Sequence, residues 1–245
     1  MKITLKDGVV KEFDNAVSVL EIAKSISEGL ARNACAGIVD GEVKDLRFVV
    51  DKDAEVSICT FEDEAGKMAF RHTASHILAQ AVKRLYPEAK IAIGPAIADG
   101  FYYDFDREKA FTQEELEALE DDGFYYDFDR EGGFTPDDLE KLEAEMKKII
   151  KKGAKLEKFT LPRDEAIKFM EEKNEPYKVE LIQDLPEDAV ISFYKQGDFT
   201  DLCAGPHLMS TKTVKAIKLT SVAGAYWRGS EKNKMLSRIY GTAYP

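Results

Sequence analysis

A charged, glycine-containing segment at 62–67 divides this chain into two stretches of different character, and this division limits the folds it can adopt. Before the segment, short runs alternate apolar and polar residues between turn residues, as half-buried strands do. After it, longer stripes of helical period are interspersed with aromatic runs typical of strands. We therefore expect an α+β protein with two units, residues 1–62 and 63–245, each able to bury its own core.

The first unit has the pattern of a β-grasp fold. Alternating apolar residues over 3–13, interrupted by a Lys-Asp-Gly turn, predict a β-hairpin. Ser18 and Glu21 form a capping box, and the apolar stripe of the helix that they start ends at Gly29. Further strands are expected around residues 36–39 and 56–61. A hairpin, a crossing helix and more strands predict a β-grasp-like arrangement.

The second unit is predicted to pack helices on an antiparallel sheet. An apolar stripe of helical period follows His72 and stops at Pro87. Further helices are expected to start at Thr112 and Thr135 and to cover residues 163–173. Strands are expected around residues 91–93, 101–105, 177–182, 189–194 and 216–222.

One stretch of this unit occurs twice, because residues 99–108 recur unchanged at 122–131. Two copies of a strand-helix unit are too few for a solenoid, so a local tandem duplication is the simplest interpretation. Only one copy of the strand can occupy its place in the sheet. We expect the other copy to form an exposed hairpin or loop.

Composition excludes several classes of protein. No apolar run approaches the length that spans a bilayer, and the N-terminus lacks the features of a secretory signal. The 3 cysteines do not suggest a disulfide framework, so we expect a reduced, cytoplasmic protein. A net charge of −11 argues against coating nucleic acid by bulk charge, although lysine clusters at 147–158 and 212–218 leave local RNA contact plausible.

All 3 histidines fall in two short motifs that also hold a cysteine, His72 with His76 and Cys203 with His207. The first two are four residues apart, which on a helix places both imidazoles on one face. The set could bind Zn²⁺, but four protein ligands would close a tetrahedral site and make the metal structural. A zinc peptidase motif is excluded, because Thr73 stands where its glutamate would be.

A metal-free site is the other interpretation of these residues. A neutral histidine can act as general base on water, and a lysine can stabilise the oxyanion that develops. Asp201 could orient a histidine or bind a substrate amine. Cys203 could be a nucleophile, although nothing in the sequence indicates a lowered thiol pKa.

Five motifs in the same order resemble the N-terminal half of bacterial threonyl-tRNA synthetases. They lie at residues 71–78, 93–95, 99–104, 201–207 and 223–229. Residues 1–62 resemble the TGS domain of that family, which is a β-grasp module. Residues 63–245 resemble its editing domain, which is related to the editing domains of alanyl-tRNA synthetases.

The resemblance implies hydrolysis of mischarged Ser-tRNA(Thr), with Thr-tRNA(Thr) spared. Serine lacks one methyl group of threonine, and a binding pocket gains only ~1–3 kcal/mol from a methyl group. A synthesis site for threonine therefore rejects serine poorly, whereas a second pocket can admit serine and exclude the larger side chain. The partner implied is the 3′ end of tRNA(Thr) carrying serine, and no membrane is involved.

The site residues follow from the matched motifs. The resemblance implies these catalytic residues: His72, His76, Lys178, Cys203 and His207. It implies these substrate-binding residues: Gly94, Tyr103 and Asp201. Tyr126 matches equally well by local sequence, and we prefer Tyr103 because its copy of the repeat directly follows residues 93–95. No cofactor is required in this interpretation; in the alternative, zinc is bound by His72, His76, Cys203 and His207.

The resemblance also limits what the chain does alone. The family's aminoacylation and anticodon-binding domains lie beyond these residues, so we expect no charging of tRNA by this chain. Full-length members are expected to be homodimers, and this chain is expected to be a monomer. Two alternatives are a zinc-braced RNA-binding module without catalytic activity and an interaction protein in which the TGS-like unit dominates.

Overall fold

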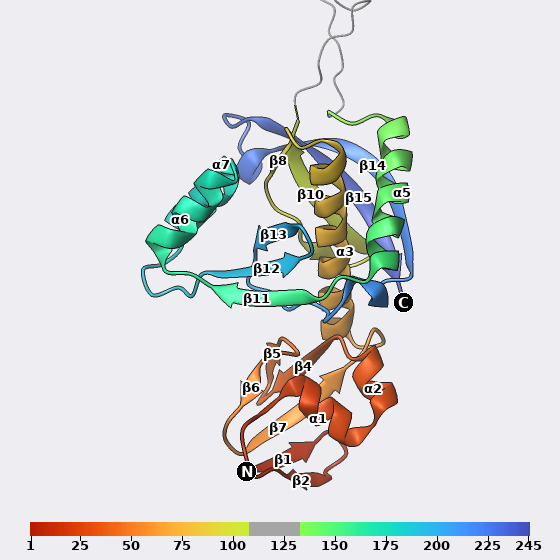
Figure 1. The fold of residues 1–245 in the computed structure, drawn as a ribbon, viewed down its shortest axis with the longest axis vertical. Coiled ribbons are helices and arrows are strands. Elements are labelled where there is room, and N and C mark those ends of the chain that lie inside the picture. The colour runs from red at the N-terminus through yellow and green to blue at the C-terminus, as the bar shows by residue number, and fades with distance from the viewer. Residues whose placement is uncertain (108–132) are drawn as a thin grey trace, which may run out of the picture.

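The fold is taken from a computed structural model, which describes residues 1–107 and 133–245. Figure 1 shows a small N-terminal unit beside a larger one, with helix α3 (Glu64–Leu85) leading from the first into the second. Helices and several largely antiparallel sheets form the α+β fold that the sequence predicts. Across the two described ranges, none of the helices combines the length and apolar character needed to cross a membrane.

The N-terminal unit contains a five-stranded sheet in the order β2-β1-β7-β4-β5. Its strands are β1 (Lys2–Leu5), β2 (Val10–Glu12), β4 (Ala36–Val39), β5 (Glu42–Lys44) and β7 (Ala54–Cys59). β1 pairs in parallel with β7 and antiparallel with β2. Helix α1 (Val19–Ile26) packs its apolar side onto this sheet around Ile3 and Val56. The β-grasp prediction is confirmed.

The first helix ends earlier than the sequence predicts. Ser18 and Glu21 form the expected capping box, but α1 stops at Ile26 and Ser27 has extended backbone angles. The Ser27 hydroxyl accepts a hydrogen bond from the Leu30 amide and starts a short second helix, α2 (Glu28–Asn33). Gly29 therefore lies inside α2 rather than at the end of α1.

Two antiparallel sheets form the larger unit. One has the order β14-β15-β10-β8, with β9 also paired to β10, and the other has the order β11-β12-β13. The strands of the first sheet are β8 (Lys90–Ile91), β9 (Ala96–Ile97), β10 (Gly100–Asp106), β14 (Ala216–Tyr226) and β15 (Met235–Tyr244). Those of the second are β11 (Leu156–Thr160), β12 (Ser192–Gln196) and β13 (Phe199–Leu202).

The first copy of the repeat lies in the larger sheet. It forms β10, in which Tyr103 is paired with Ile239 of β15. The second copy, at 122–131, lies outside the described residues, as does the helix expected to start at Thr112. Tyr103 is fully buried and stacks on Phe105 with ring centroids 4.9 Å apart, so the aromatic residues of this copy help to form the core.

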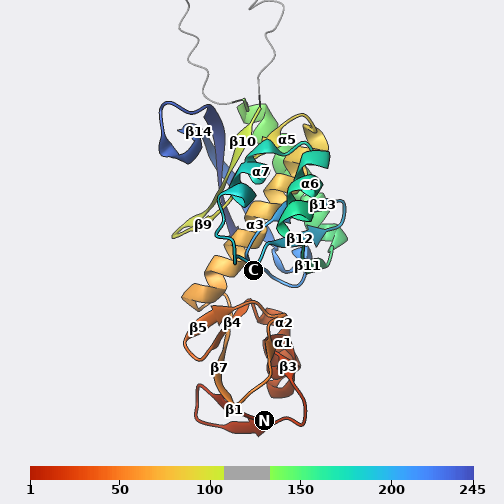
Figure 2. The same cartoon turned by 90° about the vertical axis from the view of Figure 1, so that its left-hand side faces the viewer.

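Helix α3 is buried far more completely than a single apolar stripe predicts. Figures 1 and 2 place α5 (Pro136–Lys152) and α7 (Pro176–Gln183) on opposite sides of it. The sheet strands β10 and β15 also contact it, so nearly every residue from Ala69 to Val82 is buried. Polar side chains on α3 consequently need partners inside the protein, because a buried polar group without one is costly.

Residues 177–182 form a helix, so the strand predicted there is wrong. Their aromatic and β-branched side chains suggested a strand, but Pro176 occupies the first turn of α7. Lys178 and Ile182 are buried four residues apart, as one face of a helix requires. The other predicted helix of this region is confirmed as α6 (Arg163–Glu172). The strand expected at 189–194 begins only at Ser192.

Candidate active site

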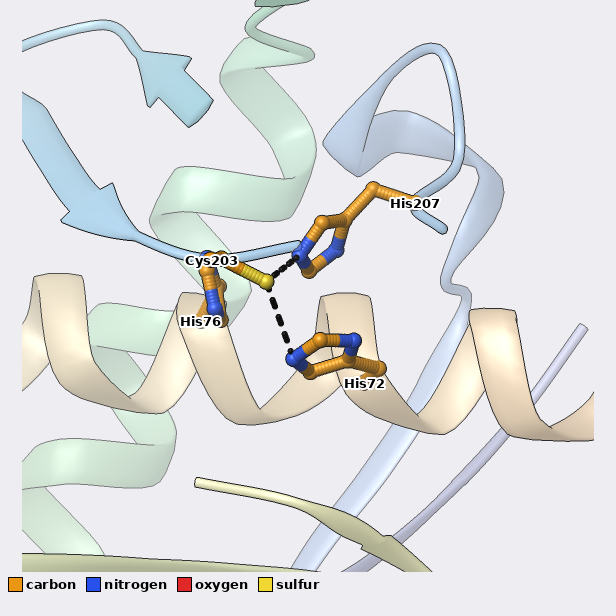
Figure 3. Close-up of side chains that lie close together, drawn as sticks. All are labelled: His72, His76, Cys203 and His207. Carbon is orange, nitrogen blue, oxygen red and sulfur yellow. Dashed lines mark hydrogen bonds between the residues drawn. The ribbon is translucent and has the colours of Figure 1, made fainter. Parts of the chain in front are cut away.

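The two histidine motifs meet at the centre of the larger unit. Figure 3 shows His72 and His76 on α3, facing Cys203 and His207 from the segment that follows β13. The Cys203 Sγ lies 3.3 Å from Nε2 of His72 and 3.2 Å from Nε2 of His207. The ring centroid of His207 is 4.2 Å from that of each other histidine. The structure thus brings together four of the candidate site residues identified in the sequence.

Thr73 fixes the orientation and tautomer of His207. Its hydroxyl oxygen lies 3.0 Å from Nδ1 of His207, 3.0 Å from the Leu208 amide nitrogen and 3.0 Å from the Ala69 carbonyl oxygen. A hydroxyl has one proton to donate and two lone pairs. All three contacts are satisfied only if Thr73 donates to Ala69 and accepts from Nδ1–H of His207. The Nε2 lone pair of His207 then points at Cys203.

A second ring nitrogen, Nε2 of His72, faces the same sulfur. The amide of Gly205 also donates to Sγ, at 3.2 Å. Two imidazole nitrogens therefore converge on one sulfur, and the thiol proton can be donated to only one of them.

Burial keeps these groups uncharged. It lowers the pKa of His72 to about 4 and that of His76 to about 3, against the opposing effect of Asp201. Burial and the neighbouring histidines hold the pKa of His207 well below its usual range. Burial also raises the pKa of the Cys203 thiol to about 12, so this side chain is protonated at neutral pH and poorly suited to act as a nucleophile.

A buried ion pair lies beside the neutral cluster. The Asp201 carboxylate is 2.9 Å from Nζ of Lys178, and it accepts a hydrogen bond of 2.5 Å from the Tyr103 hydroxyl. Nε2 of His76 lies 3.4 Å from the same carboxylate. Burial acts to raise the pKa of Asp201, but Lys178, His76 and Tyr103 outweigh it and hold that pKa below its ordinary value. Asp201 is therefore an anion that links the histidines to Lys178.

Gly94 makes room for the Tyr103 ring. A Cβ at Gly94 would lie 2.0 Å from Cδ2 of Tyr103, far inside contact distance. The carbonyl of Gly94 accepts a hydrogen bond of 2.7 Å from Ser75 of α3, which fixes this segment beside the site. The space left by Gly94 is thus filled by Tyr103, the residue that bonds Asp201.

The residues that hold the cluster in place could not be predicted from the sequence. Thr73 lies inside the first motif, but its residue type alone does not indicate that it orients a histidine. Tyr194 packs its ring 4.5 Å from that of His207, and its hydroxyl donates to Asp45 of the N-terminal unit. Asp45 lies 162 residues from His207 along the chain, so no local pattern could have paired them.

The same cluster has the chemistry of a zinc site. One ligand atom from each of His72, His76, Cys203 and His207 lies within 4.8 Å of every other. Neutral imidazole nitrogens and a cysteine sulfur are donors that Zn²⁺ prefers. Nδ1 of His76 has no hydrogen-bond partner among the described residues, so this nitrogen is available as a metal ligand. The residues present therefore fit the metal.

Comparison with known proteins identifies both units. A family model described as the TGS domain matches residues 1–60, and one described as the threonyl and alanyl tRNA synthetase second additional domain matches residues 191–240. The chain is 63% identical over 244 residues to the threonine–tRNA ligase of Acetivibrio thermocellus. It is 61% identical over 244 residues to that of Clostridium botulinum strain Alaska E43 and 59% identical over 244 residues to that of Clostridioides difficile.

The alignments cover 100% of this chain in each case, but 35%, 34% and 35% of the three relatives, so the chain spans about a third of their length. The fold and the matched models define a β-grasp TGS domain joined to a domain of the synthetase editing class. The chain matches the TGS and editing region of threonyl-tRNA synthetases.

Proposed function

We propose that this chain hydrolyses the ester bond of Ser-tRNA(Thr) and spares Thr-tRNA(Thr). The observation that supports this most is the group of uncharged imidazoles beside the buried Lys178–Asp201 ion pair. Ester hydrolysis needs a base that activates water and a positive group that stabilises the oxyanion. The relatives are named as threonine–tRNA ligases, which is why we take tRNA(Thr) as the partner.

His72 is our candidate for the general base. It is partly exposed, whereas His76 and His207 are almost completely buried. The imidazole of His72 would take a proton as a water oxygen bonds to the ester carbonyl carbon, and Nζ of Lys178 would stabilise the oxyanion. Collapse of this intermediate breaks the bond between carbon and the ribose oxygen, which receives the proton from His72. The products are free serine and uncharged tRNA.

The discrimination between serine and threonine requires a tight wall close to the reacting atoms. Tyr103 and Gly94 are packed against each other next to Asp201, which leaves little freedom on that side of the site. Excluding a methyl group sterically can exceed the ~1–3 kcal/mol that a pocket gains by binding one. We therefore propose Tyr103, Gly94 and Asp201 as substrate-binding residues.

A pocket beside Cys203 offers a route for the substrate. It has a volume of about 250 Å³ and opens to solvent. Its lining is mostly apolar: Leu181, Leu185, Val190, Ile191, Ser192, Leu202, Cys203 and Ala204. Apolar walls with a few polar groups at one end are typical of sites for small organic groups. We propose that the aminoacylated end of the tRNA enters here.

A second candidate function is supported by the convergence of zinc donors on Cys203. In this alternative, a zinc ion held by His72, His76, Cys203 and His207 braces a module that binds RNA without hydrolysing the ester. A closed structural site of this kind contributes directly to folding stability. The two candidates therefore differ in what metal removal does to the folded protein.

The test measures release of serine from Ser-tRNA(Thr) and of threonine from Thr-tRNA(Thr), with and without a strong chelator, in the wild type and in His72→Ala. Met68→Ala, an exposed position on the same helix, is the matched control. We expect selective serine release that survives chelation and is lost in His72→Ala while the melting temperature is kept. Loss of thermal stability on chelation, without any wild-type hydrolysis, would instead support the zinc-braced module.

A further inference from the structure

A loop of the N-terminal unit reaches the candidate active site. The loop lies between β5 and the short strand β6 (Val49–Val50). Oδ2 of Asp45 accepts hydrogen bonds from the main-chain amide of His207, at 3.0 Å, and from the hydroxyl of Tyr194, at 2.7 Å. Nη1 of Arg47 donates to the carbonyl of His207 at 3.2 Å. Side chains of the N-terminal unit thus bond both main-chain polar groups of His207.

Arg47 extends these contacts to neighbouring carbonyls. Its Nη2 donates to the carbonyl oxygens of Leu156, at 2.7 Å, and Leu208, at 2.9 Å. Oδ1 of Asp45 lies 2.9 Å from Nη1 of Arg47 and holds the guanidinium in place. A planar guanidinium offers several donors in a fixed geometry, which suits it to gather three carbonyls.

The loop that carries this pair is held rigidly in its own unit. The Arg47 amide donates to Oδ1 of Asp45 at 2.8 Å, and the Phe48 amide donates to the Asp45 carbonyl at 3.0 Å. Leu46, between them, is fully buried in the core of the N-terminal unit. The Leu46 carbonyl also accepts from the Leu20 amide of α1 at 2.9 Å. Asp45 and Arg47 therefore project from a fixed base.

The segment that Asp45 and Arg47 bind is not part of a β-strand. Residues 203–208 follow β13 without regular structure. The Cys203 amide donates to the Ser192 carbonyl, and three later amides donate to side chains. Gly205 donates to the sulfur of Cys203, His207 to Asp45 and Leu208 to Thr73. The direction of the His207 ring thus depends on a few side-chain contacts, and of the three acceptors of these amides Asp45 comes from the other unit.

The same carboxylate fixes the wall against which His207 packs. The hydroxyl that Tyr194 donates to Asp45 belongs to the ring that lies 4.5 Å from the His207 ring. A Cβ at Gly205 would lie 2.2 Å from this hydroxyl oxygen, so the segment passes directly over it. Asp45 therefore controls His207 through its amide and through its aromatic neighbour.

We infer that Asp45 and Arg47 of the β-grasp unit are positioning residues of the candidate active site, which hold His207 so that its Nε2 faces Cys203. The expected effect on the rate of hydrolysis rests on the proposed function. The expected effect on the orientation of His207 does not depend on it. Displacement of a reacting group by about 1 Å can reduce a rate by about a hundredfold, so a distant loop can control turnover.

The experiment compares the wild-type chain with Asp45→Ala, Arg47→Met and Tyr194→Phe, and uses Asp51→Asn, an exposed acid of the same unit, as the control. The first readout is hydrolysis of Ser-tRNA(Thr), with kcat and KM separated. We expect Asp45→Ala and Arg47→Met to lower kcat by about tenfold or more with little change in KM. Tyr194→Phe keeps the His207 amide bond and should have a smaller effect, and Asp51→Asn should have none.

The second readout is the nitrogen NMR spectrum of the histidine rings in chelator-treated protein. The wild type should show His207 as a single tautomer with the proton on Nδ1, and Asp45→Ala and Arg47→Met should lose that signature while Asp51→Asn keeps it. Folding of each variant is checked by its melting curve, and if Asp45→Ala does not fold, Arg47→Met carries the test. Unchanged His207 signals and an unchanged kcat in the folded variants would overturn the inference. An inactive wild type would contradict the proposed function alone, because the NMR comparison still decides whether Asp45 and Arg47 orient His207.

Discussion

Nζ of Lys178 lies 2.9 Å from Oδ1 of Asp201, and the two residues are only 3% and 1% exposed. Lys178 comes from helix α7 and Asp201 from strand β13, so the ion pair joins two elements that share no backbone hydrogen bonds. Each charge is stable in the interior only because the other is present. The pair therefore contributes to the fold as well as to the proposed chemistry.

Removing one member of this pair should destabilise the protein strongly. We expect Lys178→Met to cost about 3–5 kcal/mol of unfolding free energy, because Asp201 is then buried without a counter-charge. The double variant Lys178→Met with Asp201→Asn should be more stable than Lys178→Met alone. Urea unfolding of the wild type, Lys178→Met, Asp201→Asn and the double variant measures the effect. Additive losses in the double variant would contradict a coupled pair.

Tyr103→Phe should separate the role of the first copy of the repeat from that of the second. The substitution keeps the ring stacked on Phe105 but removes the hydroxyl that donates to Asp201. We expect a loss of about 1–3 kcal/mol in stability, together with slower deacylation. Tyr126→Phe makes the same change in the other copy and serves as the control. Equal effects of the two substitutions would mean that Tyr103 does not have the role we assign to it.

Local patterns predicted the elements that are defined by neighbours in sequence. The capping box at Ser18, the helix start at Thr135 and the hairpin over 3–13 are formed as expected, since each depends on residues a few positions apart. The strand predicted at 177–182 is wrong. The residue types suit a strand, but Pro176 in the first turn and the burial of one face favour a helix. Tertiary packing overrode intrinsic preference at this point.

The chemical groups of the candidate site could be predicted from the sequence, but the residues that orient these groups could not. The spacing of His72 and His76 places both on one face of a helix, and the motif resemblance associated them with Cys203 and His207. Thr73 and Asp45 gave no such signal, because their partners lie 134 and 162 residues away. A threonine or an aspartate without its three-dimensional context is indistinguishable from a solvent-exposed residue.

The buried histidines should make the protein less stable in acid. The pKa of His76 is about 3 in the folded protein, mainly because of burial, whereas an unfolded chain gives about 6.5. Between these values the unfolded state binds more protons, so the stability present above about pH 6.5 is lost as the pH falls toward the folded pKa. The slope for one such histidine is about 1.4 kcal/mol per pH unit.

We therefore expect the stability of His76→Gln to fall less steeply than that of the wild type between about pH 6.5 and pH 4. Chemical unfolding at several pH values, in chelator-treated protein, measures this difference. Carboxylates that do not contact His76 titrate alike in both proteins, so the comparison cancels their contribution. Parallel curves would show that His76 has a similar pKa in the folded and unfolded states.

Gly94→Ala should damage the site through sterics alone. The new Cβ would lie 2.0 Å from the Tyr103 ring, which is fully buried. Overpacking of this kind costs about 1–3 kcal/mol and should weaken the hydrogen bond between Tyr103 and Asp201. Gly29→Ala is the matched control, because Gly29 lies inside α2 with its nearest atom 3.9 Å from the added Cβ.

Gly29→Ala should stabilise the protein by about 0.5–1 kcal/mol, since alanine is a better helix former than glycine. The two glycine substitutions are thus expected to have opposite signs in thermal unfolding, and only Gly94→Ala should reduce the release of serine. If Gly94→Ala were as stable and as active as Gly29→Ala, the close contact between Gly94 and Tyr103 would have no part in shaping the site.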